Sequence, residues 1–564
     1  MDKKINSVIQ TWLSGQYDPN TQAEIRRLQH ENPSALEDAF YKNLEFGTGG
    51  LRGIMGVGTN RMNKYTVGAA TQGLANYLLQ QYPNQKIKVA IAFDSREQSD
   101  FFAQVSANIL SANAIHCFLF EEIRPTPELS FAVRALRCQA GIVITASHNP
   151  PEYNGYKVYW SDGGQLVPPH DHLVIQEVNK ITRVEQIKWD ANPTLISTMG
   201  EDIDREYLAR VQSLVQTPVA RAQAQNMKIV YTPLHGTGIT VIPRALQNMG
   251  FEQVCIVKEQ ALPDGRFPTV KYPNPEDTEA LLLSLKLADT LDADLVLATD
   301  PDADRVGVAA RDKNGNMQLF NGNEIAAMLV AYQLQTLQKK KLLCRETDYV
   351  VKTIVTTDLI KEIAHTYGIP CYDVLTGFKY IAEKIETIGE KGHFLCGGEE
   401  SNGFLTGDFV RDKDAVSTCC MIAELVATLN ANKKTLSCFL EDIYQQFHRY
   451  KEVQVSLTRQ GKSGQEDIAN MMRTFRTTPP DVLGDSPVIQ IRDFLESDQF
   501  DHGQLLPKAD VLQFFTQKGD KITVRPSGTE PKIKFYISVT DRSDTPTTAL
   551  NERIELIKKF FFKD

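Results

Sequence analysis

The most regular feature of the chain is an alternation of short apolar, β-branched runs with longer amphipathic stretches. Apolar runs of roughly four to eight residues bounded by turn residues are typical of buried strands, whereas helices repeat apolar residues at every third or fourth position. Strand-like runs lie at 87–93, 115–120 and 141–144, and helical stretches such as 68–79 accompany them. This alternation predicts parallel α/β units.

The same alternation returns twice before the pattern changes. A second cycle begins with KIVYTPLHGTG at Lys228 and runs through VCIVK to the apolar run 293–298. A third covers roughly 321–450, with YVVKTIV at Tyr349 and FLCGG at Phe394. From about Lys451 the strands become shorter, as in KITVR and IKFYISV, and a helical stretch at 547–562 closes the chain.

These patterns predict three similar α/β domains with mixed or parallel sheets, followed by a smaller α+β domain at the C-terminus. The first forty or so residues show helical spacing of Ile5, Val8, Ile9 and Leu13, so we expect a helical extension packed against the first domain. The predicted domain ranges are 1–205 with this extension, 206–320, 321–450 and 451–564.

A polar loop, TASHNPPEYNGYK at 145–157, follows the apolar run 140–144. A buried parallel strand delivers reactive side chains at its carboxyl end. Ser147 stands at that exit with His148 beside it, and Lys157 further on can neutralise an anion. The serine is therefore a candidate nucleophile or phosphate carrier, although an ordinary polar turn has similar composition.

A second loop, TDPDADR, follows the apolar run 293–298 and places Asp300, Asp302 and Asp304 at alternate positions. Three neighbouring carboxylates repel one another unless a cation compensates, and hard oxygen ligands suit Mg²⁺. The alternative, an acidic solvated turn or helix cap, explains one aspartate better than three. Arg305, which follows directly, can meet a phosphate or brace a carboxylate.

Two further loops carry donors and acceptors suited to a sugar phosphate. FLCGGEESNGF combines adjacent glycines, which admit a ligand close to the backbone, with Glu399 and Ser401, which can bind sugar hydroxyls. VRPSGTEPKIKFY forms a short turn of phosphate-binding composition, although Pro-Ser-Gly alone also indicates an ordinary turn. Its candidate phosphate ligands are Arg525, Ser527, Gly528 and Thr529.

Together with FGTGGLRG at Phe46, these four loops in this order resemble the α-D-phosphohexomutase superfamily. The GEES form and the chain length are most similar to its bacterial phosphoglucomutase/phosphomannomutase branch, and the resemblance spans most of the chain, up to Lys532. It implies an isomerase that interconverts glucose 1-phosphate and glucose 6-phosphate. The resemblance also implies one Mg²⁺ per chain, a phosphoserine enzyme, and glucose 1,6-bisphosphate as intermediate and activator.

The resemblance assigns roles to individual residues. Ser147 would carry the phosphoryl group and bind the metal together with Asp300, Asp302 and Asp304. Lys157 and Arg52 would stabilise the transferring group, with His148 in support. The residues expected to bind substrate are Arg305, Thr376, Gly377, Glu399, Ser401, Lys413, Arg525, Ser527, Gly528, Thr529 and Lys534.

Two parts of this assignment are less direct. The segment between Ser401 and Lys413 is about one residue longer than in the family pattern, so the match of Lys413 depends on how that segment folds. The stretches 94–96 (DSR) and 376–380 (TGFKY) have an ordinary loop as the alternative interpretation.

Composition is compatible with a multi-domain enzyme of small anionic substrates. The chain has 564 residues, which exceeds what one hydrophobic core serves, and a net charge of −9, which argues against nucleic acid or an anionic membrane as a bulk partner. Nine scattered cysteines, the absence of a signal-like apolar core in MDKKINSVIQTWL and the lack of a membrane-length apolar run favour a cytoplasmic protein. We expect hexose phosphates as partners and a monomer or weak homo-oligomer.

Three alternatives to the glucose reaction stay open on the sequence. Mannose phosphates or pentose phosphates could use the same machinery, because GEES instead of GEMS favours glucose by a single residue. A non-catalytic phosphosugar-binding protein would not need a metal-braced serine. A phosphatase with an aspartyl nucleophile in DPDADR would release phosphate and would not need Ser147.

Overall fold

The computed structural model describes residues 3–47, 50–214, 221–459, 461–496, 498–527, 532–541 and 546–562. The chain divides into two compact units. Unit 1 comprises residues 1–310, 385–387 and 403–428, and unit 2 comprises 311–384, 388–402 and 429–564. The four predicted domain ranges stay predictions.

Unit 1 begins with three helices, which confirms the helical extension: α1 (Lys3–Ser14), α2 (Pro19–Glu31) and α3 (Pro33–Phe40). Buried Trp12 stacks on Tyr17 at 4.3 Å between ring centroids and meets Tyr65 edge-on at 5.4 Å. Tyr65 lies on α4 (Lys64–Gln81), and its hydroxyl also donates to Asp18 at 2.8 Å. Aromatic packing and this hydrogen bond therefore hold the extension against the first α/β layer.

The first sheet of unit 1 has the order β1-β5-β4-β2-β3-β6. Its parallel centre and one edge are formed by β2 (Lys88–Phe93), β3 (His116–Phe120), β4 (Ala140–Ile144) and β6 (Ile196–Met199). At the other edge β5 (Tyr153–Trp160) and β1 (Leu51–Ile54) run antiparallel. Every residue of β4 is buried, as expected for a central parallel strand, and its carboxyl end leads into the serine loop.

The second sheet follows the same plan. Parallel strands β7 (Lys228–Thr232), β8 (Gln253–Ile256) and β9 (Leu295–Thr299) are joined through helices that include α10 (Ile242–Asn248) and α12 (Thr278–Leu291). Strand β10 (Val306–Arg311) then pairs antiparallel with β9. The aspartate loop is the connection from β9 to β10, so it leaves the sheet at a carboxyl end, as the serine loop does.

Unit 2 contains a parallel sheet and an antiparallel sheet. The parallel strands are β12 (Asp348–Thr353), β13 (Cys371–Val374) and β14 (His393–Glu399), with helices α13 (Gly322–Lys339), α14 (Leu359–Thr366), α15 (Phe378–Ile388) and α17 (Leu436–Gln446). The antiparallel sheet consists of β16 (Arg449–Thr458), β23 (Lys532–Asp541), β22 (Lys521–Pro526), β21 (Leu512–Thr516), β18 (Ser486–Asp493) and β17 (Val482–Leu483), in this order.

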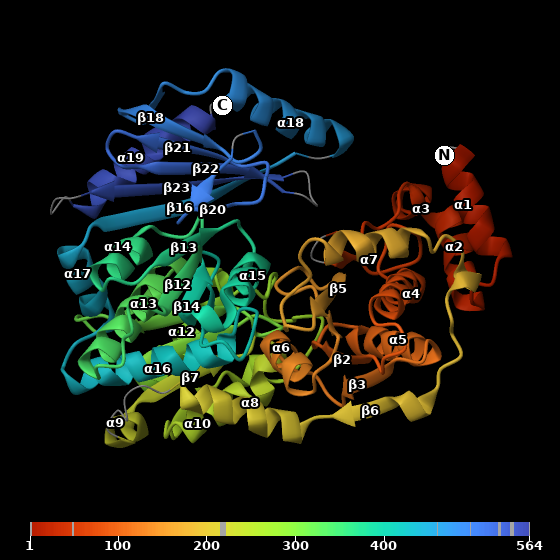
Figure 1. The fold of residues 1–564 in the computed structure, drawn as a ribbon, viewed down its shortest axis with the longest axis horizontal. Coiled ribbons are helices and arrows are strands. Elements are labelled where there is room, and N and C mark those ends of the chain that lie inside the picture. Colours follow the sequence, from red (N-terminus) through yellow and green to blue (C-terminus); the bar gives the residue numbers. More distant parts are fainter. Residues whose placement is uncertain are drawn as a thin grey trace. The chain divides into compact units, whose positions relative to one another are not determined.

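Helices α18 (Gly461–Thr477) and α19 (Thr547–Phe561) lie on one side of the antiparallel sheet, where they share its apolar core (Figure 1). The expected fold class is thus confirmed, with three α/β modules followed by an α+β module. Among the described helices none is by itself long and apolar enough to cross a membrane. Only α16 (Ala415–Ala431) and α17 together have the required length and apolar composition, and the two helices are bent by 89° relative to each other.

A buried ion network anchors the start of β22 to the parallel sheet of unit 2. The Lys352 ammonium, fully buried on β12, lies 2.8 Å from one oxygen of Asp358 and 2.9 Å from Asp373. The other Asp358 oxygen is 2.7 Å from the ammonium of Lys521, the first residue of β22. Because β22 ends at the predicted phosphate loop, this network fixes the strand that carries Arg525.

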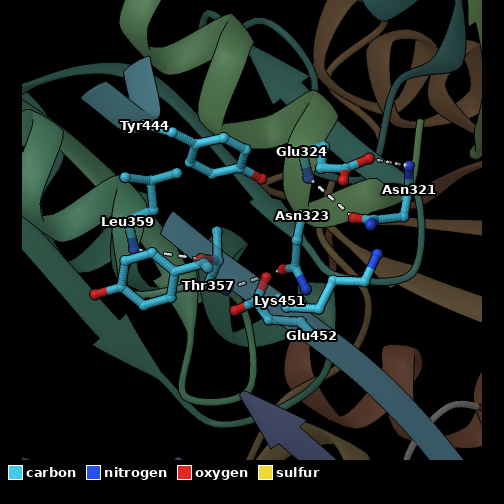
Figure 2. Close-up of a pocket in the computed structure, with 9 residues that line it drawn as sticks. Asn321, Asn323, Glu324, Thr357, Leu359, Tyr444, Lys451 and Glu452 are labelled. Carbon is cyan, nitrogen blue, oxygen red and sulfur yellow. Dashed lines mark hydrogen bonds between the residues drawn. The ribbon is translucent and has the colours of Figure 1, made fainter. Parts of the chain in front are cut away.

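A small pocket lies beside this network, between the start of α13 and β16 (Figure 2). Asn321 and Glu324 cap α13 reciprocally, each side chain accepting a hydrogen bond of 3.0 Å from the other residue's backbone N–H. Across the pocket, burial raises the pKa of Glu452 to about 7, although Lys521 and a hydrogen bond from Ser538 act in the opposite direction. Glu452 is therefore a carboxyl group that titrates near neutrality.

Candidate phosphoryl-transfer site

Ser147 lies just beyond the carboxyl end of β4, in a tight and mostly buried turn. Its backbone has the left-handed φ of 52°, a conformation that costs a non-glycine residue roughly 1–3 kcal/mol. The Ser147 N–H donates to the Thr145 hydroxyl at 2.8 Å, and the Ser147 hydroxyl donates to an Asp300 carboxylate oxygen at 2.7 Å. His148 Nδ1 lies 3.2 Å from the same hydroxyl. The turn therefore presents the serine oxygen to the aspartate loop.

The three aspartates form a compact buried cluster. One carboxylate oxygen from each of Asp300, Asp302 and Asp304 lies within 4.8 Å of the others. The second oxygen of Asp300 accepts the backbone N–H groups of Asp304 and Arg305, each at 3.1 Å, which closes the loop around that carboxylate. The alternative interpretation, a solvated acidic turn, is wrong because all three side chains are buried.

The donor set fits a divalent cation. Burial raises the pKa of Asp300 well above its usual value, and the charges of Asp302 and Asp304 raise it further, which is the electrostatic cost that a bound cation would remove. In the described part of the chain, one oxygen of Asp302 and one of Asp304 are buried and accept no hydrogen bond. Buried carboxylate oxygens that accept no hydrogen bond are available as ligands, and Mg²⁺ prefers oxygen ligands.

Two buried lysines converge on the same carboxylates. Lys157 on β5 lies 2.7 Å from Asp302 and 3.4 Å from Asp304. Burial alone would lower the pKa of Lys157, but Asp302 and Asp304 outweigh it, so this pKa is raised and the ammonium stays charged. Lys413 lies 3.1 Å from Asp304 and 3.1 Å from Asp412. The longer segment before Lys413 therefore still brings this residue to the aspartate loop, whereas its predicted role in binding substrate stays a prediction.

The remaining predicted residues of unit 1 lie around this cluster. Arg52 on β1 donates to the Asn149 side chain of the serine loop at 3.4 Å. Arg305 forms an ion pair with Glu276 at 2.7 Å, so in this state it braces a carboxylate rather than facing open solvent.

The predicted sugar-binding loops come together in unit 2. Glu399 is the last residue of β14, and one of its oxygens accepts the Gly377 N–H at 3.1 Å. Thr376 precedes Gly377 and has a buried hydroxyl, and Ser401 follows in the turn after β14. The stretch 376–380 is thus tied to the GEES loop rather than being an independent surface loop.

The phosphate loop follows β22 in the same unit. Arg525 on β22 lies directly opposite Lys534 on β23, which places two cations side by side, and the Ser527 N–H donates to the Lys532 carbonyl at 2.7 Å. Burial raises the pKa of Tyr536, and the charge of Glu400 adds to this while that of Arg525 opposes it. Gly528 and Thr529 lie outside the described residues.

Two contributors escaped the sequence analysis. Thr126, the first residue of α6 (Thr126–Ala135), donates its hydroxyl to Asp302 at 2.9 Å, and its N–H donates to the Asp302 carbonyl at 2.9 Å. Buried Asp412 accepts from Tyr159 at 2.6 Å and from Lys413 at 3.1 Å, which orients the lysine. Nothing in the sequence around Thr126 indicates a contact with a loop 176 positions away.

Comparison with known families agrees with this geometry. Residues 43–185, 205–315 and 321–447 match, in turn, phosphoglucomutase/phosphomannomutase α/β/α domains I, II and III. Phosphoglucomutase from Staphylococcus aureus (strain MRSA252) is 38% identical over 521 residues, covering 90% of this chain and 92% of that protein. Phosphoglucomutase from Staphylococcus haemolyticus (strain JCSC1435) is 37% identical over 509 residues, covering 89% and 91%.

Solved structures share the fold at lower identity. The open form of parafusin, a phosphoglucomutase from Paramecium, aligns with a TM-score of 0.70 at 17% identity, covering 92% of this chain and 95% of that one. A phosphoglucomutase/phosphomannomutase family protein from Burkholderia thailandensis aligns with a TM-score of 0.64 at 18% identity, covering 90% and 96%.

Proposed function

Because the chain belongs to the phosphoglucomutase/phosphomannomutase family, we propose that it interconverts glucose 1-phosphate and glucose 6-phosphate through a phosphorylated Ser147. The observation that carries this proposal is the Ser147 hydroxyl, 2.7 Å from Asp300 in a cluster with two buried lysines. The similarity to two staphylococcal proteins named phosphoglucomutase favours glucose over mannose or pentose phosphates.

Charge compensation is the main task of such a site. Phosphorylated Ser147 would carry a charge of about −1.5 to −2 beside three carboxylates, an arrangement that needs nearby cations. Lys157 and Lys413 supply two ammonium groups on those carboxylates. When bound by Asp300, Asp302, Asp304 and Ser147, Mg²⁺ would neutralise charge on the transferring phosphoryl group.

Proton movement has to accompany transfer to and from the serine oxygen. In the unphosphorylated state the Ser147 hydroxyl donates to Asp300 at 2.7 Å, and His148 Nδ1 lies 3.2 Å from the same hydroxyl, where it would accept a proton in the tautomer that is protonated on Nε2. Arg52, which contacts the serine loop through Asn149, is placed to orient the transferring group together with Lys157.

The sugar and its distal phosphate would be held by unit 2. Glu399 and Ser401 offer contacts for sugar hydroxyls, while Arg525, Lys534 and Ser527 offer the cations and donors that a phosphate dianion accepts. Donation from Ser147 to a hexose monophosphate would give glucose 1,6-bisphosphate, which must reorient and return its other phosphate. The cytoplasmic location and the monomer or weak oligomer stay predictions.

A substrate panel tests this proposal. Purified protein with Mg²⁺ and glucose 1,6-bisphosphate should isomerise glucose 1-phosphate with a higher kcat/KM than mannose, ribose or glucosamine 1-phosphate. Ser147→Ala should lose nearly all turnover and keep its fold, because a small side chain is removed. Preference for another sugar would overturn the glucose assignment, and release of inorganic phosphate without need of Ser147 would favour the phosphatase alternative.

A further inference from the structure

A single buried arginine donates hydrogen bonds to four backbone carbonyl oxygens of the serine loop. Arg96 follows β2 and is 3% exposed. Its guanidinium donates to the carbonyl of Ser147 at 2.6 Å, to those of Pro150 at 2.8 Å and Tyr153 at 2.9 Å, and also to that of Asn149. All four acceptors belong to residues 147–153, which comprise most of the connection between β4 and β5 and the first residue of β5.

Other segments also hold this loop, because the Ser147 N–H donates to the Thr145 hydroxyl at 2.8 Å and the Glu152 carbonyl accepts the Met55 N–H at 2.8 Å. Within it, the backbone hydrogen bonds are those from Asn149 to the Ala146 carbonyl and from Tyr153 to the Pro150 carbonyl, each 3.1 Å long. Four carbonyl oxygens that point at one place repel each other unless a donor satisfies them, and a buried carbonyl left without a donor is destabilising. A planar guanidinium with five N–H donors meets this need, whereas an ammonium has three donors in a different geometry.

Arg96 is itself held in place from two sides. Its Nε lies 3.5 Å from Asp94, which also accepts the Arg96 backbone N–H at 2.9 Å. Its guanidinium stacks 4.9 Å from the ring centroid of Phe267, a buried residue of the segment between β8 and α12. At Gly265, in the same segment, a Cβ atom would come within 2.7 Å of the Arg96 Cα, so the two segments are in direct backbone contact.

We propose that Arg96, stacked on Phe267, is a positioning residue that holds the serine loop in the shape that directs the Ser147 hydroxyl at Asp300. The inference rests on the proposed role of Ser147 as phosphoryl carrier. Arg96 acts through the loop backbone, and the left-handed turn at Ser147 is the strained feature that its hydrogen bonds offset. Phe267 belongs to the same α/β module as Asp300, so its contact with Arg96 connects the serine loop to the module that carries the aspartate loop.

The test compares Arg96→Met, Arg96→Lys and Phe267→Leu with the full-length wild-type protein. Arg96→Met removes every donor, so we expect kcat to fall by about 100-fold, the cost of a nucleophile misplaced by around 1 Å, with little change in KM. Arg96→Lys keeps the charge and some donors and should recover part of that loss. Phe267→Leu keeps all the hydrogen bonds and should have the mildest effect.

Hydrogen exchange separates positioning from general destabilisation. In Arg96→Met the amides of 146–153 should exchange faster, and phosphorylation of Ser147 by glucose 1,6-bisphosphate should slow in parallel with kcat. Arg476→Met is the matched control, since Arg476 is a largely buried arginine ion-paired to Asp493 at 2.9 Å in the C-terminal module. It should lower stability without changing exchange in 146–153.

The proposal is overturned if folded Arg96→Met keeps wild-type kcat, or if its loop exchanges at the wild-type rate. If Arg96→Met does not fold, Arg96→Lys tests the proposal instead. Wild-type turnover and wild-type loop exchange in Arg96→Lys would show that the planar guanidinium is not needed. Absence of mutase activity in the wild-type protein would instead refute the proposed function, while faster loop exchange in Arg96→Met would still report the brace.

Discussion

Replacing Thr126 by valine isolates one contact to the aspartate loop. Valine matches the shape of threonine but cannot donate the 2.9 Å hydrogen bond to the Asp302 carboxylate, whereas the backbone bond from residue 126 to the Asp302 carbonyl is retained. A buried hydrogen bond to a charged group contributes about 1.5–3 kcal/mol. Asp302 would keep the 2.7 Å hydrogen bond from Lys157.

Loss of an outer partner of a metal ligand lowers metal affinity by about 10- to 100-fold. We therefore expect the Mg²⁺ concentration for half-maximal activity to rise by that factor in Thr126→Val, with nearly full activity restored at saturating Mg²⁺. Isothermal titration with Mg²⁺ should show the same weakening. The matched control is Thr71→Val, which removes a buried hydroxyl that donates to the Val67 carbonyl at 2.8 Å in the same unit.

The control should lose comparable stability and keep the wild-type Mg²⁺ dependence. An unchanged Mg²⁺ midpoint in Thr126→Val would show that Thr126 does not orient a metal ligand. An equal shift in both variants would show that the effect comes from lost stability.

Two further predictions concern the buried ion network of unit 2 and the pocket beside it. Asp358→Asn leaves the buried ammonium groups of Lys352 and Lys521 without their shared carboxylate, so the free energy of unfolding measured with denaturant should fall by about 3 kcal/mol. A decrease below about 1 kcal/mol would contradict the anchoring of β22. The pKa of Glu452 is raised from 4.5 to about 7, so protonated Glu452 contributes at most about 3 kcal/mol of stability, which is fully present below pH 4.5 and lost as the pH rises through 7. In Glu452→Gln the free energy of unfolding should therefore depend less on pH between about pH 5 and 8. The same pH dependence in the variant and the wild-type protein would refute this prediction.

The strand exits were predictable from the sequence because a buried strand followed by a polar loop leaves a local signature. Apolar runs ending at Ile144 and Ala298 placed Ser147 and Asp300 correctly at carboxyl ends, and their direct contact follows from two sheets that present these ends to one another within unit 1. The same reasoning linked Glu399 to a strand end.

What the sequence could not show are partners brought together only by tertiary packing. Thr126 and Arg96 lie in stretches with ordinary loop or helix-cap composition, and their roles depend on acceptors far along the chain. The DSR stretch could be interpreted as an ordinary loop because Arg96 donates to backbone carbonyls. Every residue type has a backbone carbonyl, so the sequence does not indicate which residues accept these hydrogen bonds.

The most direct test of the central claim is the mass of the active protein before and after reaction with substrate. Intact-mass and peptide analysis should find one phosphate on Ser147, in protein as purified or after incubation with glucose 1,6-bisphosphate, and excess hexose monophosphate should remove it as bisphosphate forms. Ser147→Ala should carry no such phosphate and should not isomerise glucose 1-phosphate. Full activity in Ser147→Ala, or turnover by wild-type protein that never carries phosphate at Ser147, would contradict the account.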